Sequence, residues 1–151
     1  MTEPTKDGLI DVVVEAVIRR PSEVVAAYAS DPSNAPDWYA NISEVVWKTA
    51  PPLQVGSEVA FVARFLGRTL RYTYNVVEYT PTSLVMRTEE GPFPMETTYR
   101  YETTPEGHTR MTLRNRGTPS GFSRLMRPFI RTAIRRANLK DLKALKARLE
   151  E

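Results

Sequence analysis

The chain has 151 residues, of which 41% are hydrophobic and 26% charged, and it carries a formal net charge of +3. These values are typical of a globular protein, and no apolar run reaches the ~20 residues that a membrane-spanning helix needs. Both a disordered chain and a membrane-spanning chain are therefore excluded. The absence of cysteine excludes disulfides, thiolate chemistry and cysteine-based zinc or iron–sulfur sites.

No linker or internal repeat divides the sequence, so we expect one domain over residues 1–151. The polar residues 1–8 lack the basic start and apolar stretch of a secretory signal, and we expect them to form a flexible N-terminus. This start, together with the lack of cysteine, predicts a cytoplasmic protein. The sequence leaves open whether the protein is a monomer or a homodimer.

The first part of the chain predicts a strand followed by two short helices. Residues 10–18 alternate apolar and more polar side chains, as in a strand with one buried face. Pro21 suits the first turn of a helix over residues 21–30, which ends before Asp31-Pro32. A second helical turn is expected over residues 36–40.

The middle of the chain has an apolar period of two, interrupted by short turns that contain Gly or Pro. Such turns favour an antiparallel meander, and the first strand adds a seventh strand to the sheet. The strands predicted for this region span residues 43–48, 58–65, 69–79, 83–88, 95–103 and 109–116.

Residues 121–151 predict one long helix. In its first half, apolar side chains that include Met126, Phe129 and Ile130 recur at three- and four-residue steps and form one stripe, which we expect to face the sheet. Pro128 interrupts this pattern and predicts either a kink or a later helix start.

In the second half of this helix the apolar side chains Leu142, Leu145 and Leu149 lie almost opposite Phe129. The two halves are therefore expected to pack on different surfaces.

From Arg124 to Arg148 the chain is strongly basic and contains a single acidic residue, Asp141. A solvated helix face is the expected interpretation, and contact with a membrane surface is the weaker alternative. Nucleic-acid binding is not expected, because no recognised nucleic-acid-binding motif accompanies the cations. The basic residues are Arg124, Arg127, Arg131, Arg135, Arg136, Lys140, Lys143, Lys146 and Arg148.

The inner face of the predicted sheet is aromatic and methionine-rich, yet it carries hydroxyl and amide groups. Such groups are costly in a sealed core, whereas a cavity can hydrate them or offer them a ligand. We therefore expect a cavity between the sheet and the long helix that holds a hydrophobic or amphipathic small molecule. The predicted lining is Trp38, Phe61, Phe65, Tyr72, Tyr74, Met86, Met95, Thr97, Tyr99, Met111, Leu113, Asn115, Met126, Phe129 and Ile130.

Several short motifs accompany this order of elements. They are Asp31-Pro32 with Trp38, Val55-Gly56-Ser57, Leu66-Gly67-Arg68, Val77-Glu78-Tyr79-Thr80-Pro81 before Ser83-Leu84, Gly91-Pro92, Tyr99 with Tyr101, Gly107 with Thr109, and Asp141-Leu142-Lys143-Ala144-Leu145-Lys146. Together they resemble the helix-grip fold of the START-related (SRPBCC) superfamily, most closely its polyketide cyclase and dehydrase-like branch. The resemblance covers almost the whole chain from Ile10, and none of these motifs is catalytic.

The resemblance implies an α+β fold of the START/Bet v 1 type, in which a seven-stranded curved antiparallel sheet wraps around the C-terminal helix. Two short helices would follow the first strand. The resemblance further implies an apolar, lipid- or polyketide-like ligand between the helix and the sheet.

Three functions stay open, and we expect ligand binding or carriage rather than catalysis. A cyclase or dehydratase without metal would need inward polar groups, but a tyrosine with a pKa of about 10 is a poor base, and no inward carboxylate, histidine or arginine stands out. A protein-interaction or regulatory module with a filled core is the third alternative. The candidates for catalytic assistance are Tyr72, Tyr74, Thr97, Tyr99 and Asn115.

No cofactor and no metal are expected. The only histidine, His108, lies in a predicted turn, and no acidic loop has the spacing of a calcium site.

Overall fold

The computed structural model describes residues 9–65, 67–90, 94–118 and 124–151, without the side chains of Phe65, Glu89, Glu90 and Arg124. The expected flexible residues 1–8, the Gly91-Pro92 turn and the predicted helix start at Gly121 lie outside the described residues. The first elements are β1 (Ile10–Ile18), α1 (Ser22–Ala29), the 3-10 turn η1 (Pro32–Asn34) and α2 (Ala35–Trp38). The remaining elements are β2 (Ile42–Trp47), β3 (Glu58–Phe65), β4 (Arg68–Thr80), β5 (Ser83–Glu90), β6 (Met95–Thr103), β7 (Thr109–Gly117), the 3-10 turn η2 (Arg124–Met126) and α3 (Arg127–Leu149).

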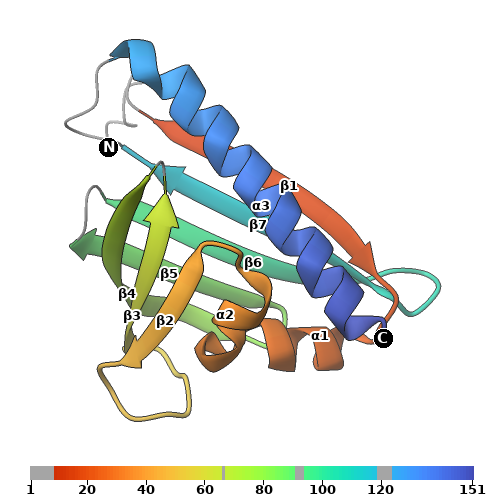
Figure 1. Ribbon diagram of the computed structural model, residues 1–151. Coiled ribbons are helices and arrows are strands. Elements are labelled where there is room, and N and C mark those ends of the chain that lie inside the picture. The colour runs from red at the N-terminus through yellow and green to blue at the C-terminus, as the bar shows by residue number, and fades with distance from the viewer. Residues whose placement is uncertain (1–8, 66, 91–93, 119–123) are drawn as a thin grey trace, which may run out of the picture.

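The strands form one seven-stranded antiparallel sheet in the order β1-β7-β6-β5-β4-β3-β2. The predicted meander from β2 to β7 is confirmed, and β1 pairs with β7 at the far edge. Figure 1 shows the curved sheet with α3 lying along it and the short helices α1 and α2 at one end. This is the predicted helix-grip arrangement.

The predicted inner face of the sheet is confirmed as the main part of the core. Because side chains alternate along a strand, one set faces the helix side of the sheet and the other set faces away from it. Tyr99 lies between Leu84 and Leu113 in register, so the inner residues of neighbouring strands form continuous rows. The buried inner residues include Val59, Phe61, Tyr74, Val76, Leu84, Met86, Tyr99, Tyr101, Met111 and Leu113.

The long helix begins later than the 121–151 pattern predicts. Helix α3 starts at Arg127, so Pro128 lies in its first turn. The backbone N–H groups of a first turn have no partner within the helix, so the N–H that proline lacks costs no helical hydrogen bond. Of the two outcomes predicted for Pro128, the later start is confirmed. None of the helices in the described part of the chain is long and apolar enough to cross a membrane.

The stripe predicted for the first half of α3 is partly wrong. Ile130 is buried as predicted, but Phe129 is 69% exposed and Met126 is 44% exposed. The helix packs on β1 along a row that continues from Ile130 to Ile134, and Phe129 lies about 100° away from this row. Leu142 and the other leucines of the second half are buried.

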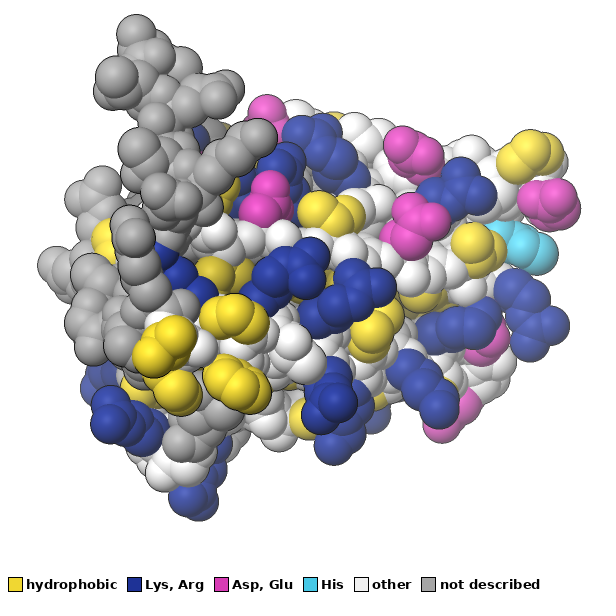
Figure 2. Space-filling model, turned by 90° about the horizontal axis from the view of Figure 1, so that it is seen from above, with side chains coloured by type: hydrophobic (Ala, Val, Ile, Leu, Met, Phe, Trp, Pro, Cys, Tyr) yellow, Lys and Arg dark blue, Asp and Glu magenta, His cyan; other side chains and the backbone are white. Residues whose placement is uncertain are grey.

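The basic residues of α3 divide into two groups. Some hold the helix to β1: Arg135 donates a hydrogen bond to the carbonyl of Val13 at 3.3 Å, and Lys146 donates one to the carbonyl of Val17 at 2.7 Å. Figure 2 shows Lys and Arg side chains spread along one side of the molecule, next to a group of hydrophobic side chains. The exposed basic residues of α3 include Arg131, Arg136, Lys140 and Lys143.

Candidate functional site

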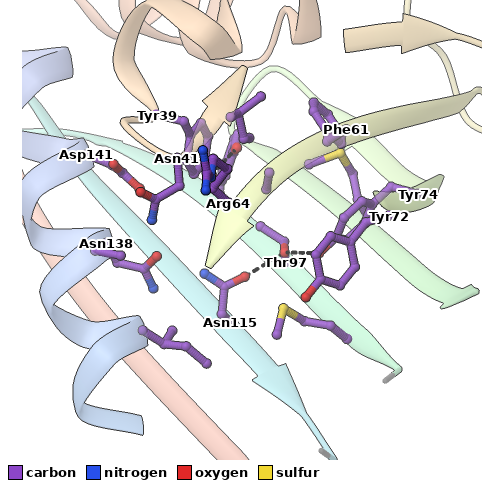
Figure 3. A pocket seen from close by; sticks show the side chains of 17 residues that line it. Tyr39, Asn41, Phe61, Arg64, Tyr72, Tyr74, Thr97, Asn115, Asn138 and Asp141 are labelled. Carbon is purple, nitrogen blue, oxygen red and sulfur yellow. Dashed lines mark hydrogen bonds between the residues drawn. The ribbon is translucent and has the colours of Figure 1, made fainter. Parts of the chain in front are cut away.

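A cavity of about 140 Å³ lies between the sheet and α3 (Figure 3). Strands β3 to β7 form one wall, the middle of α3 forms the opposite wall, and the segment after α2 forms the third. The cavity is partly open, since Arg64, one of its lining residues, is exposed. A sheet and a helix that diverge from each other thus leave a space that side chains do not fill.

Most of the lining that the sequence predicted on the sheet is brought together here. Alternation along the strands decides which side chains can reach this space, and the structure places these predicted residues around it. They are Phe61, Tyr72, Tyr74, Met86, Met95, Thr97, Tyr99 and Asn115.

The other predicted residues lie elsewhere. Those buried in the core outside the cavity lining are Trp38, Met111, Leu113 and Ile130. Met126 and Phe129 are exposed on the surface, because the contact row of α3 runs through Ile130 instead. The side chain of Phe65 is outside the described residues.

Sequence reasoning predicted an α3 wall but placed it at Met126, Phe129 and Ile130, and it missed the wall that follows α2. On α3 the missed residues occur at positions 134, 137, 138 and 141, a spacing that keeps them on one helix face. This helical spacing could have indicated the wall. However, Asn138 and Asp141 are polar, and polar residues at such positions are typical of a solvated helix face. The missed lining residues are Tyr39, Asn41, Ile42, Ala63, Arg64, Ile134, Ala137, Asn138 and Asp141.

The statement that no inward carboxylate or arginine stands out is therefore wrong. Asp141 is 2% exposed and lines the cavity. Arg64 also lines the cavity while remaining exposed. It lies next to the β2 edge, where its N–H donates a hydrogen bond to the carbonyl of Asn41 at 2.8 Å.

The partly buried Tyr39 and the buried Tyr99 lie side by side in the cavity lining. The hydroxyls of Tyr39 and Tyr99 share a hydrogen bond, and the Trp38 ring packs against both, with ring centroids 4.1 Å and 5.8 Å away. Burial raises the pKa of each hydroxyl well above its ordinary value. Both tyrosines are therefore neutral donors and acceptors at neutral pH, and Trp38 is a packing residue behind them.

The sheet wall carries a short polar network. The Thr97 hydroxyl donates a hydrogen bond to Oδ1 of Asn115 at 2.6 Å, and the Tyr74 hydroxyl lies 3.5 Å from Thr97 Oγ1. Burial raises the pKa of Tyr74 to about 12 and that of Tyr72 to about 12. These groups can recognise a ligand by hydrogen bonding but are unsuited to accept a proton at neutral pH.

The helix wall carries an ionisable group, the carboxyl of Asp141. Oδ1 of Asp141 accepts a hydrogen bond from the N–H of Ala40 at 3.0 Å. Burial raises the pKa of Asp141 to about 6, although the Ala40 bond and the charge of Lys140 act in the opposite direction. The carboxyl of Asp141 thus exchanges its proton close to neutral pH.

Outside the cavity, His108 lies in the turn between β6 and β7, where its N–H donates to Oγ1 of Thr104 at 3.1 Å. The described part of the chain contains no group of three or more His, Cys, Asp or Glu side chains that could hold a metal ion. The cavity is therefore the candidate site.

The family model described as "Polyketide cyclase / dehydrase and lipid transport" matches residues 10–150. The chain belongs to this family. None of the curated proteins matches the sequence.

Several solved structures share the fold of this chain. An aromatase/cyclase, Zhui, from a Streptomyces species is 16% identical, with a TM-score of 0.79 and 94% of each chain covered. A major latex-like protein from Panax ginseng is 14% identical, with a TM-score of 0.75, 95% of this chain and 99% of that chain covered. A START superfamily protein from Mycobacterium smegmatis is 14% identical, with a TM-score of 0.75, 95% of this chain and 97% of that chain covered. At these identities the similarity establishes the helix-grip fold.

Proposed function

We propose that this protein binds a small hydrophobic or amphipathic molecule in the cavity between the sheet and α3. The observation that carries the proposal is the cavity itself, with Phe61, Tyr72, Met86 and Met95 on its walls and a few buried polar groups among them. Concave, mostly apolar sites with a small number of polar groups are typical ligand sites. The family, whose description names cyclases and lipid transport, is consistent with such a ligand.

The size of the cavity limits what can lie fully inside it. An apolar cavity of about 150 Å³ holds one benzene molecule, and the cavity here is about 140 Å³. One ring, or the end of a longer lipid- or polyketide-like molecule, therefore fits inside. The rest of a longer molecule would leave the cavity past Arg64.

A cavity-filling variant tests this proposal. Ala137 lines the cavity from α3, so Ala137→Leu should fill part of it and weaken the binding of a one-ring probe such as acetophenone by at least about tenfold. Ala147→Leu makes the same change on an exposed position of the same helix and should leave binding unchanged. Isothermal titration measures both, and equal affinity in the two variants would contradict binding in the cavity.

A cyclase or dehydratase is the second candidate, and the Asp141 carboxyl favours it. A group with a pKa of about 6 in a cavity is suited to give or take a proton at neutral pH. It could remove a proton next to a ligand carbonyl, or protonate a departing hydroxyl. Turnover of a linear polyketone probe by the wild type and its loss in Asp141→Asn would support this candidate, whereas absence of turnover in the wild type would leave binding alone.

The third alternative, an interaction module with a filled core, finds no support in a molecule with this cavity. The cytoplasmic location and the choice between monomer and homodimer stay predictions.

A further inference from the structure

Two carboxamide side chains point into the cavity from opposite walls. Asn115 comes from β7 and Asn138 from α3, and Figure 3 shows their amide groups directed toward each other across the space. Asn115 is 8% exposed and Asn138 is 5% exposed. Both amides are therefore largely removed from bulk water.

The orientation of Asn115 is defined by its neighbour Thr97. In the structure the Thr97 hydroxyl donates to Oδ1 of Asn115 at 2.6 Å. Oδ1 therefore lies on the Thr97 side, and Nδ2 is directed into the cavity. Among the described residues, no hydrogen-bond acceptor pairs with this Nδ2.

Asn138 is a buried donor without a partner. Its Nδ2 has no hydrogen-bond partner among the described residues. An unpaired buried N–H is costly, and asparagine is a poor helix former, so Leu or Ala would suit this position in α3 better if only stability mattered. A ligand atom that accepts a hydrogen bond in the cavity would satisfy this donor.

We propose that the ligand presents a neutral carbonyl oxygen between Asn115 and Asn138, which each donate one hydrogen bond from Nδ2. A carbonyl oxygen has two lone pairs and can accept from both sides. This inference deepens the proposed function and depends on it.

The charges around the cavity favour a neutral carbonyl over a carboxylate. Asp141 lies three residues after Asn138 on the same face of α3, and its carboxylate would repel a ligand carboxylate. Arg64 also lines the cavity, but it is exposed, so water and salt screen its charge. A ketone or an aldehyde on an apolar ring is therefore the expected ligand class.

The test compares two one-ring probes of the same shape, acetophenone and α-methylstyrene. Acetophenone has a carbonyl oxygen where α-methylstyrene has a methylene group. Asn138→Leu removes the donor at similar volume. The ratio of the two dissociation constants should shift against acetophenone by about fivefold in this variant relative to the wild type. Asn115→Leu should shift it in the same direction, and thermal unfolding of each variant checks its fold.

A vibrational measurement adds a readout that does not depend on the measured affinities. The carbonyl stretch of acetophenone bound to the wild type should lie below its value in a hydrocarbon solvent, because hydrogen bonding weakens the bond, and it should rise in Asn138→Leu. Benzoate should bind more weakly than acetophenone at pH 8, where Asp141 is ionised.

The outcomes separate this inference from the proposed function. Suppose that both probes bind the wild type, that the ratio of their dissociation constants is unchanged in the variants, and that the carbonyl stretch of bound acetophenone equals its value in a hydrocarbon solvent. Only the carbonyl inference is then overturned. Benzoate binding more tightly than acetophenone would overturn its neutral-carbonyl part. If neither probe binds the wild type, the proposed function is overturned together with it.

Discussion

At the scale of single residues, Asp141 combines burial with a titratable group. Its carboxyl faces the cavity near the hydroxyls of Tyr39 and Tyr99, which are neutral at physiological pH, and the neighbouring charge is that of Lys140. Burial disfavours its charged form, and one backbone N–H compensates only in part. The residue therefore reduces stability at neutral pH, as residues of functional sites often do.

This cost predicts a pH-dependent effect of Asp141→Asn. The pKa of about 6 lies above the ordinary value of 3.8, so between these values the folded state binds more protons than the unfolded state. Stability contributed by the protonated carboxyl is therefore present below about pH 4 and is lost as pH rises to about 6. At pH 7.5 the variant should have a free energy of unfolding about 2 kcal/mol above that of the wild type, and at pH 4 the two should be similar.

Urea unfolding at the two pH values measures this difference. Asp37→Asn, at an exposed aspartate, is the matched control and should change stability by no more than about 0.5 kcal/mol at either pH. A variant Asp141→Asn that is less stable than the wild type at pH 7.5 would refute the assignment.

At the scale of elements, α3 has two roles along its length. Its C-terminal half is fixed to β1 and the segment that follows: the Arg19 N–H donates to Glu150 at 2.8 Å, and Arg20 donates to the carbonyl of Leu149 at 2.8 Å. Leu145 is fully buried in this half. The middle of the helix, around Asn138, borders the cavity instead. A fixed end can thus hold the cavity wall in place.

This division predicts unequal costs for two identical substitutions on α3. Leu145→Ala should lower the free energy of unfolding by about 3 kcal/mol, because it leaves a cavity in a packed contact. Leu139→Ala, at a position that is 44% exposed, should cost less than about 1 kcal/mol. Chemical denaturation gives both values, and similar losses in the two variants would show that the C-terminal half is not the anchor.

The strands could be predicted from the sequence more closely than the helix contacts. Alternation and Gly- or Pro-containing turns indicated β3 and β6 with the bounds that the structure has, and the same alternation placed Tyr74 and Thr97 at the cavity. The face of α3 could not be predicted as well. Its start depends on Pro128, and a bulky residue such as Phe129 looks like a core residue until the helix is docked.

The polar part of the site was harder to predict still. Asn138 and Asp141 lie among lysines and arginines, and in sequence they read as part of a solvated face. Their burial follows from the position of α3 against the sheet, a tertiary contact that local periodicity does not contain. Tyr39 was missed for the same reason, since its partner Tyr99 is distant in sequence.

At the scale of the whole molecule, the cavity exists because the sheet curves away from a helix that is anchored at one edge strand. Figure 1 shows α3 beside β1, with the opposite edge of the sheet free of it. The apolar wall of the sheet and the polar wall of α3 meet in a space suited to one ring with a polar substituent. A ligand that binds only the folded protein would also stabilise it, by about 2.7 kcal/mol at one hundred times its dissociation constant.

Methionine methyl resonances test the central claim, a ligand in this cavity, most directly. Met86 and Met95 line the cavity, whereas Met126 is on the surface and serves as an internal control. In a titration of the methyl-labelled wild type with acetophenone, the resonances of Met86 and Met95 should shift together along one saturable curve, while that of Met126 stays in place. Shifts confined to Met126, or none at saturating probe, would contradict the account.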